Sequence, residues 1–312
     1  MWNECGLLVL SLMITSSAQA DPFDAVETEW AGTENKLRED WTGSERNQAK
    51  LWTSYQESEG VLTQVDFENQ NVVIEVSASD SKAEALAKAA EVIQQLTGPD
   101  SVIKRDELKI VPEVVERIEP APFKGKTAYR IVIPFAANFI QKRAHKIYPL
   151  VKRWSEQNAI SPFLVLAVIR QESGFNPRAR SWVPAYGLMQ IVPRFAGIEV
   201  MIALGRGAIG PNADALYDPN QNIEIGTTYL RLIHSVHFKD LQNTAQQHVI
   251  SICAYNWGPD RLKKLLVRHP EMLKSDFQTF YADLLPRLPA ETRDYVQKVL
   301  AYEHEFSKME GL

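Results

Sequence analysis

The sequence predicts an α+β protein in which a small mixed α+β domain precedes an all-helical domain. Alternating apolar patterns typical of strands occur almost only before residue 136. Helix caps and helical periodicity then follow one another to the C-terminus. The length of 312 residues, with 45% hydrophobic and 23% charged residues, suits two globular domains and excludes a disordered chain.

The first part of the chain is typical of an export signal. Residues 6–14 form an apolar run that is too short to span a bilayer, and Ala18 and Ala20 fit the small-residue pattern of a cleavage site. No Lys or Arg precedes the run, which departs from the usual signal. Cys5 lies ahead of the run, so it is not placed to carry a lipid. We expect residues 1–20 to be a signal peptide.

Residues 21–143 are expected to form the α+β domain. Its first stretch, residues 23–55, is polar and helical in propensity. Trp30, Trp41 and Trp52 recur there every eleven residues, which is close to three helical turns and returns to nearly the same face. A packing role fits this stripe better than ligand binding.

The rest of this domain carries a hairpin, a helix and a further strand. Residues 61–67 and 71–77 alternate around a polar turn, which predicts the hairpin. Residues 82–96 are rich in alanine and predict a helix, which the following Gly and Pro end. Residues 127–135 predict the strand.

Residues 144–312 are expected to form the helical domain. Ser161 and Asp218 each precede a proline, the pattern of an N-cap followed by proline in the first helical position. Helices are therefore expected to begin after both residues. The pattern predicts further helices over residues 245–255, 260–269, 275–284 and 291–308.

Charge and cysteine content exclude several classes of protein. Residues 21–143 hold 15 Lys and Arg against 22 Asp and Glu, whereas residues 144–312 hold 19 against 16. The small excess of positive charge in residues 144–312 is compatible with an anionic polymer as ligand. It is far below the positive charge typical of nucleic-acid-binding domains, so no nucleic-acid partner is expected. Two cysteines exclude a disulfide framework. His234, His237 and His248 lack a metal-ligand spacing, and we expect neither metal nor cofactor.

Glu172 is the leading candidate for chemistry. It ends a helix that is apolar on every side, and Gly174 follows as a helix terminator. Burial beside the core and the negative end of the helix dipole both raise the pKa of a carboxyl group. A carboxyl that stays protonated near neutral pH is what a general acid requires. The alternative is a solvated glutamate at a fraying helix end.

Two later motifs strengthen the first interpretation. GLMQ at residues 187–190 offers a tight turn with Met189 and Gln190, and AYN places Tyr255 and Asn256 at the end of another apolar helix. Aromatic faces and amide groups that converge from helix ends suit a sugar ligand.

The ES, GLMQ and AYN motifs, in this order and at these spacings, resemble the lytic transglycosylases of the soluble lytic transglycosylase type. The likeness covers roughly residues 144–308, including DPNQNIEIGTTYL and ETRDYVQKV. It implies a helical fold similar to goose-type lysozyme and peptidoglycan glycan strands as the substrate. The preceding α+β domain resembles that of a membrane-bound subfamily.

The resemblance also implies a role for individual residues. Glu172 matches the catalytic acid and base. The positions expected to contact the sugar or line its groove are Ser181, Met189, Gln190, Tyr255, Asn256 and Tyr295. Pro184 stands where many relatives have glycine, and no lipobox is present. The location implied is the periplasm of a Gram-negative bacterium, with peripheral association with the outer membrane or cell-wall machinery left open.

The implied reaction needs one carboxyl group. Glu172 protonates the oxygen between N-acetylmuramic acid and N-acetylglucosamine, and then acts as base on the C6 hydroxyl of the muramic sugar. Intramolecular attack gives a 1,6-anhydro end without water, helped by the high effective concentration of the tethered hydroxyl. The alternatives are a hydrolase with a second acid among Asp214, Asp218 and Asp260, or a non-catalytic peptidoglycan-binding protein.

Overall fold

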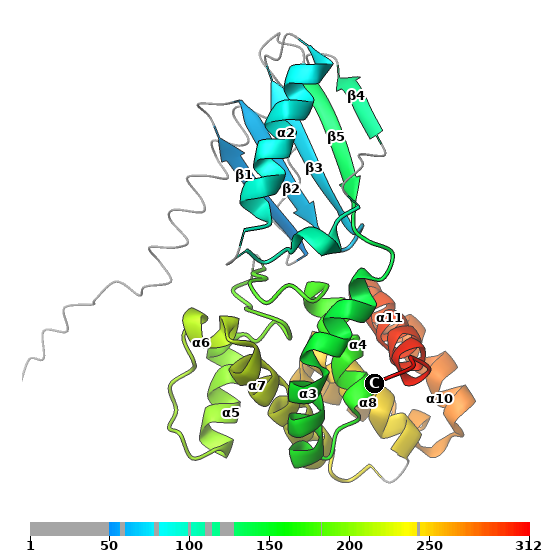
Figure 1. Ribbon diagram of the computed structural model, residues 1–312. Helices are drawn as coiled ribbons and strands as arrows, with labels where there is room; N and C mark the ends of the chain where they lie inside the picture. The colour runs from blue at the N-terminus through cyan, green and yellow to red at the C-terminus, as the bar shows by residue number, and fades with distance from the viewer. Residues whose placement is uncertain are drawn as a thin grey trace, which may run out of the picture. The chain divides into compact units, whose positions relative to one another are not determined.

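The computed structural model describes residues 50–56, 60–77, 81–98, 101–109, 114–118, 128–181, 183–241 and 244–312. In these ranges a sheet with one covering helix precedes a series of helices (Figure 1). The predicted fold class is confirmed. The predicted signal peptide, together with Trp30 and Trp41, lies outside the described residues.

The sheet is antiparallel throughout, with the strand order β1-β2-β3-β5-β4. Its strands are β1 (Leu51–Gln56), β2 (Val61–Asp66), β3 (Asn71–Ser77), β4 (Val114–Ile118) and β5 (Ala128–Pro134). The predicted hairpin is confirmed as β2 and β3, and the predicted later strand as β5. The sequence pattern did not predict β4, which is short and lies at one edge of the sheet.

Trp52 lies in β1, so the predicted helix is wrong over this part of the chain. The strand pairs along the free edge of the hairpin, with Trp52 opposite Val65. Backbone hydrogen bonds to an edge that is already formed outweigh the weak local preference for helix, as is common for strands.

Helix α2 (Lys82–Leu96) has the predicted bounds and covers one face of the sheet. The Ser81 hydroxyl accepts a hydrogen bond from the Glu84 amide and caps its first turn. Its buried face comprises Ala85, Ala89, Val92 and Ile93, and buried sheet residues such as Ile74 and Ile131 belong to the strands on which α2 packs. Small residues let the helix approach the sheet closely.

The helical domain contains α3 (Phe139–Asn158), α4 (Pro162–Ser173), α5 (Ile198–Ala203), α6 (Ala213–Tyr217), α7 (Pro219–Leu232), α8 (Thr244–Trp257), α9 (Pro259–Arg268), α10 (Phe277–Leu284) and α11 (Ala290–Ser307). Both predicted caps are confirmed: the Ser161 hydroxyl accepts from the Leu164 amide at 3.3 Å, and the Asp218 carboxylate accepts from the Gln221 amide at 2.8 Å. The four predicted C-terminal helices correspond to α8–α11. The long α3 and the short α5 and α6 were not predicted.

Helix α4 is the centre of the helical domain. Its residues from Val165 to Ile169 are fully buried, as the apolar run predicted, and α11 and α3 pack against it. Within the described ranges, no helix combines the length and apolarity needed to cross a membrane.

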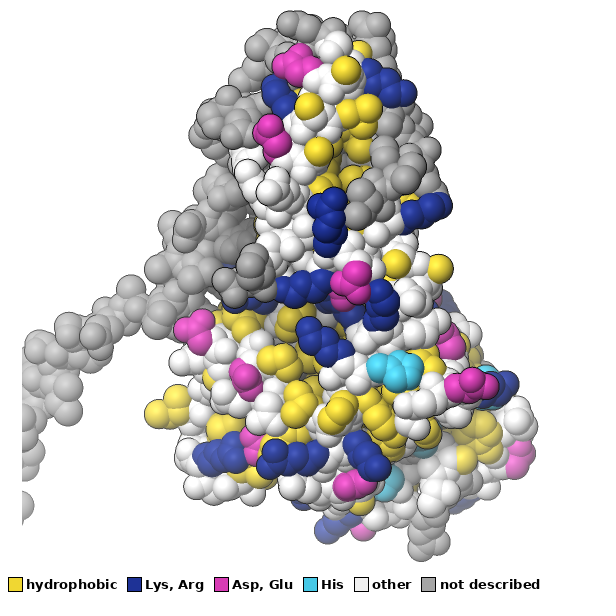
Figure 2. Space-filling view, viewed as in Figure 1, with side chains coloured by type: hydrophobic (Ala, Val, Ile, Leu, Met, Phe, Trp, Pro, Cys, Tyr) yellow, Lys and Arg dark blue, Asp and Glu magenta, His cyan; other side chains and the backbone are white. Residues whose placement is uncertain are grey.

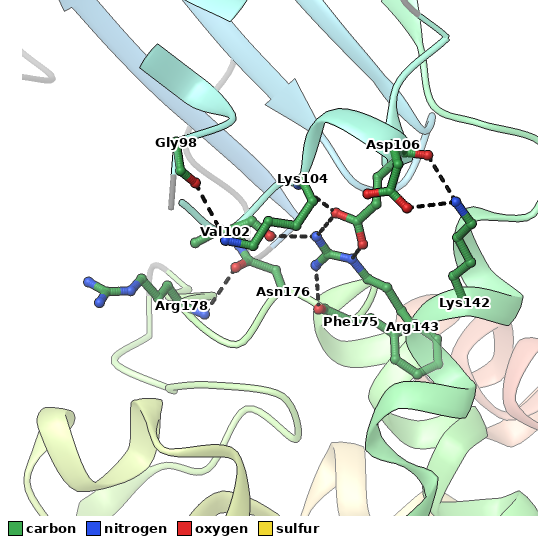
Figure 3. A network of polar contacts seen from close by, with 10 residues as sticks. Gly98, Val102, Lys104, Asp106, Lys142, Arg143, Phe175, Asn176 and Arg178 are labelled. Carbon is green, nitrogen blue, oxygen red and sulfur yellow. Dashed lines mark hydrogen bonds and ion pairs between the residues drawn. The ribbon is translucent and has the colours of Figure 1, made fainter. Parts of the chain in front are cut away.

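A buried ion pair joins α3 to the sheet domain (Figure 3). Arg143 donates to both carboxylate oxygens of Glu107, at 2.8 and 2.6 Å, and its remaining donors reach the Phe175 and Val102 carbonyl oxygens. The predicted domain boundary between residues 143 and 144 falls inside α3. Helix α3 is therefore held by contacts on both sides of that boundary.

Candidate active site

Glu172 lies in the last turn of α4, where the helix changes into a loop. Gly174 ends the helix in the left-handed region, with φ of 57°. Ser173 is fully buried, and its hydroxyl reaches the carbonyl oxygens of Ile169 and Leu188. The second contact ties the end of the helix to the GLMQ segment, so two of the motifs are joined directly.

The Glu172 carboxyl group is positioned by α11. The Tyr295 hydroxyl donates a hydrogen bond to Glu172 Oε1 at 2.7 Å. Burial raises the Tyr295 pKa well above its ordinary value, so this hydroxyl keeps its proton and remains a donor. The sequence placed a tyrosine near the acid only by resemblance, and the structure brings the two side chains together.

Burial raises the pKa of Glu172 to about 7. Loss of solvation is the largest cause, because the carboxylate form is poorly stabilised beside the core. The Tyr295 hydrogen bond and the positive charge of Lys50 act in the opposite direction, and the negative charge of Glu291 raises the pKa further. The carboxyl group therefore keeps its proton to a higher pH than an ordinary glutamate, as a general acid requires.

The GLMQ segment forms a tight turn that Asn222 of α7 supports. Gly187 has φ of 75°, and a Cβ there would lie 2.1 Å from the Leu216 carbonyl oxygen. Asn222 is fully buried; its carboxamide oxygen accepts from the Met189 amide, and its nitrogen donates to the Tyr186 and Leu216 carbonyl oxygens. Only glycine fits the turn, and Asn222 satisfies three of the backbone groups around it.

Met189 is fully buried, so its side chain packs below the site. A Cβ on Gly226 would come within 2.3 Å of the Met189 sulfur, which explains the glycine in α7. The Tyr255 hydroxyl donates to the Met189 carbonyl oxygen at 2.8 Å and so joins the AYN motif to the turn. Met189 therefore contributes to the site through its backbone, whose amide contacts Asn222 and whose carbonyl oxygen contacts Tyr255.

The other predicted residues are held by neighbours within the helical domain. Gln190 donates to the Ala179 and Gly187 carbonyl oxygens, and the Asn256 side chain accepts from the Thr292 hydroxyl. The Ser181 hydroxyl donates to the Val183 carbonyl oxygen. Among the described residues, no hydrogen bond joins Ser181 to Glu172, so a role for this serine at the acid or the sugar stays a prediction.

Residues of the sheet domain also reach the site, and the sequence did not reveal them. A Cβ on Gly174 would lie 2.8 Å from Phe67 Cβ, in the turn between β2 and β3. Glu68 in the same turn lies 3.6 Å from Lys50 and 3.7 Å from Lys298 of α11. Lys50, Phe67 and Glu68 come more than 100 residues before Glu172 in the chain, and no local pattern marks them.

The three aspartates that the sequence offered as the second acid of a hydrolase do not influence the Glu172 carboxyl group. Asp218 caps α7, and Asp214 and Asp260 are exposed at the starts of α6 and α9. None of the three contributes to the shifted pKa of Glu172, whereas Glu291 does. In the described part of the chain, no three His, Cys, Asp or Glu side chains are grouped to hold a metal ion.

The chain matches the family model described as "Transglycosylase SLT domain" over residues 149–277. These residues form a transglycosylase SLT domain. The matched part of the chain holds Glu172, the GLMQ turn and the AYN motif, but Tyr295 lies beyond it.

The chain is also similar to curated proteins of the predicted subfamily. The chain is 30% identical over 188 residues to membrane-bound lytic murein transglycosylase C of Haemophilus influenzae (strain PittEE), covering 58% of this chain and 52% of that protein. It is 34% identical over 180 residues to the protein of the same name from Edwardsiella ictaluri, covering 55% and 49%. The chain thus spans about half the length of these relatives.

Among solved structures, the 70 kDa soluble lytic transglycosylase SLT70 from Escherichia coli aligns with a TM-score of 0.42 at 32% identity. The alignment covers 51% of this chain and 24% of that protein.

Proposed function

We propose that this protein is a peptidoglycan lytic transglycosylase that cleaves the bond between N-acetylmuramic acid and N-acetylglucosamine. The observation that carries the proposal is the Glu172 carboxyl group, with a pKa of about 7, hydrogen-bonded by Tyr295 in the SLT domain. The predicted export signal and the proposed peptidoglycan substrate favour the periplasm of a Gram-negative bacterium as the site of this activity.

The proposed reaction proceeds in two proton transfers. Glu172 first donates its proton to the glycosidic oxygen as the bond to the muramic C1 breaks. The Tyr295 hydroxyl and the Lys50 charge stabilise the resulting carboxylate. The carboxylate then takes the proton of the C6 hydroxyl as that oxygen bonds to C1. Glu172 returns to its starting form, and the product is a 1,6-anhydro sugar.

Hydrolysis is the second candidate reaction, because Glu291 lies close enough to raise the Glu172 pKa. A second carboxylate is what a water-activating glycosidase requires. Glu291 is exposed on the first turn of α11, where capping or solvation also accounts for an acidic residue. The transglycosylase proposal therefore rests on a single carboxyl group, and the hydrolase would need both.

The mass of the released muropeptides distinguishes the candidates. Purified peptidoglycan is digested with the protein, and the soluble products are weighed. Anhydro ends support the transglycosylase; reducing ends, heavier by one water molecule, support the hydrolase; and no release supports a binding protein.

Replacement of Glu172 by Gln tests the assignment of the catalytic group. The amide keeps the size and the Tyr295 contact but has no acidic proton, so we expect release to fall by about 10³-fold or more. Glu291→Gln is the matched control and should retain anhydro release. Substantial turnover by Glu172→Gln would show that another group performs the chemistry.

A further inference from the structure

A groove of about 610 Å³ lies on the sheet beside α2. Helix α2 packs on β3 and β5, so the same face of β1 and β2 remains beside it (Figure 1). Thr63 and Val65 of β2 line the groove, and Gln95 and Leu96 of α2 form a wall. The segment 101–103, which follows α2 along the chain, also lines the groove.

The rims of the groove carry groups that suit a peptide. Trp52 is 37% exposed, which is high for tryptophan, and offers an aromatic surface on β1. Both Gln56 and Gln95 line the groove; Gln56 Nε2 donates to Gln95 Oε1 at 3.5 Å, which leaves Gln56 Oε1 as an acceptor and Gln95 Nε2 as a donor. Amides of this kind match the N–H and C=O groups of a peptide backbone.

Part of the groove lining is cationic and belongs to the SLT domain. Asn176 and Arg178 line it there, and both follow Glu172 closely in the chain. In Figure 3 the Arg178 guanidinium points away from the polar network around Arg143. Arg178 is exposed and forms no ion pair within the described ranges. Figure 2 shows Lys and Arg side chains close together across the middle of this face.

We infer that this groove binds the stem peptide of the peptidoglycan strand, with Arg178 pairing with a peptide carboxylate. The inference rests on the proposed function. A glycan strand offers few charges, since the lactyl carboxyl group of the muramic sugar is consumed in the amide bond to the peptide. The stem peptide supplies free carboxylates and backbone amides, which are the groups that Arg178, Gln56 and Gln95 can pair with. The groove then extends recognition from the sugar to the peptide.

Two soluble substrates test the inference: glycan strands that carry stem peptides, and the same strands stripped by an amidase, which leaves a lactyl carboxylate on each muramic sugar in place of the peptide. Arg178→Ala should lower kcat/KM about three- to fivefold more on peptide-bearing strands than on bare strands, the size of an exposed ion pair. Trp52→Ala should show the same bias. Arg268→Ala, an exposed arginine at the end of α9, is the matched control and should show none.

Each other result overturns the inference. An equal loss on both substrates would make the groove a glycan site, and no loss would leave it without a role in substrate binding. Calorimetry can measure the binding of the free stem tetrapeptide to Glu172→Gln and to Glu172→Gln/Arg178→Ala. This measurement needs no turnover. Peptide binding without cleavage of either substrate by the wild-type protein would refute the proposed function alone. Absence of binding together with cleavage of bare strands would refute the groove alone.

Discussion

The chemistry of this site depends on how one carboxyl group is solvated. Glu172 lies near the end of a helix whose residues from Val165 to Ile169 are fully buried, and loss of water is the largest cause of its raised pKa. The sequence predicted this direction from the apolar helix and its dipole. It could not predict the magnitude, because Lys50 and Glu291 come from distant parts of the chain and act with opposite signs.

Replacement of Lys50 by Met should move the pH dependence of cleavage. The positive charge favours the ionised form of Glu172, so its removal raises the Glu172 pKa above about 7. Cleavage requires the protonated form and falls as pH rises through that pKa. The alkaline limb of kcat/KM should therefore shift upward by roughly half a pH unit.

The other charged or titratable groups that act on Glu172 are Tyr295 and Glu291 of α11 and Tyr255 of α8, and the variant leaves them in place. Lys146→Met, an exposed lysine on α3, is the control and should leave the profile unchanged. A downward shift in Lys50→Met, or none, would show that Lys50 does not stabilise the Glu172 carboxylate.

At the scale of elements, local signals predicted the sequence of helices well. Pro after a capping side chain marks α4 and α7, and hydrophobic periodicity marks the long α8 and α11. Strands at the edges of the sheet were harder, because β1 and β4 owe their form to pairing with neighbours. The supporting role of Asn222 was also hidden, although it lies in a motif that the sequence singled out.

Asn222 should be costly to replace because it joins α7 to the GLMQ turn. Asn222→Ala leaves the buried Met189 amide without its partner and removes one donor each from the Leu216 and Tyr186 carbonyl oxygens, of which the latter keeps the Ile191 amide. We expect the free energy of unfolding to fall by about 3 kcal/mol, measured by urea denaturation. Gln221→Ala, the exposed neighbour, should cost less than about 0.5 kcal/mol. Similar losses in both variants would contradict this account of the turn.

At the scale of the whole molecule, the site combines two domains that differ in fold and in charge. The SLT domain supplies Glu172 and the motifs around it, while the sheet domain supplies Phe67 and the Lys50 charge. The sequence predicted a mixed first part and a helical second part, and it placed every motif proposed for catalysis in the second. Nothing in the sequence indicated that residues of the sheet domain reach Glu172, because contacts between two domains leave no periodic pattern in the sequence of either domain.

The buried pair of Arg143 and Glu107 should determine whether the described domains unfold together. Arg143→Met leaves Glu107 buried without its partner, which should cost about 3–5 kcal/mol. Arg143→Met/Glu107→Leu removes both charges and should recover most of that loss. Lys142→Met breaks the neighbouring exposed pair with Asp106 and should cost under about 1 kcal/mol.

Calorimetry should show one unfolding transition in the wild-type protein and a separate early transition of the sheet domain in Arg143→Met. A single transition with an unchanged midpoint in Arg143→Met would mean that apolar contacts such as Phe67 against Gly174 suffice to couple the domains.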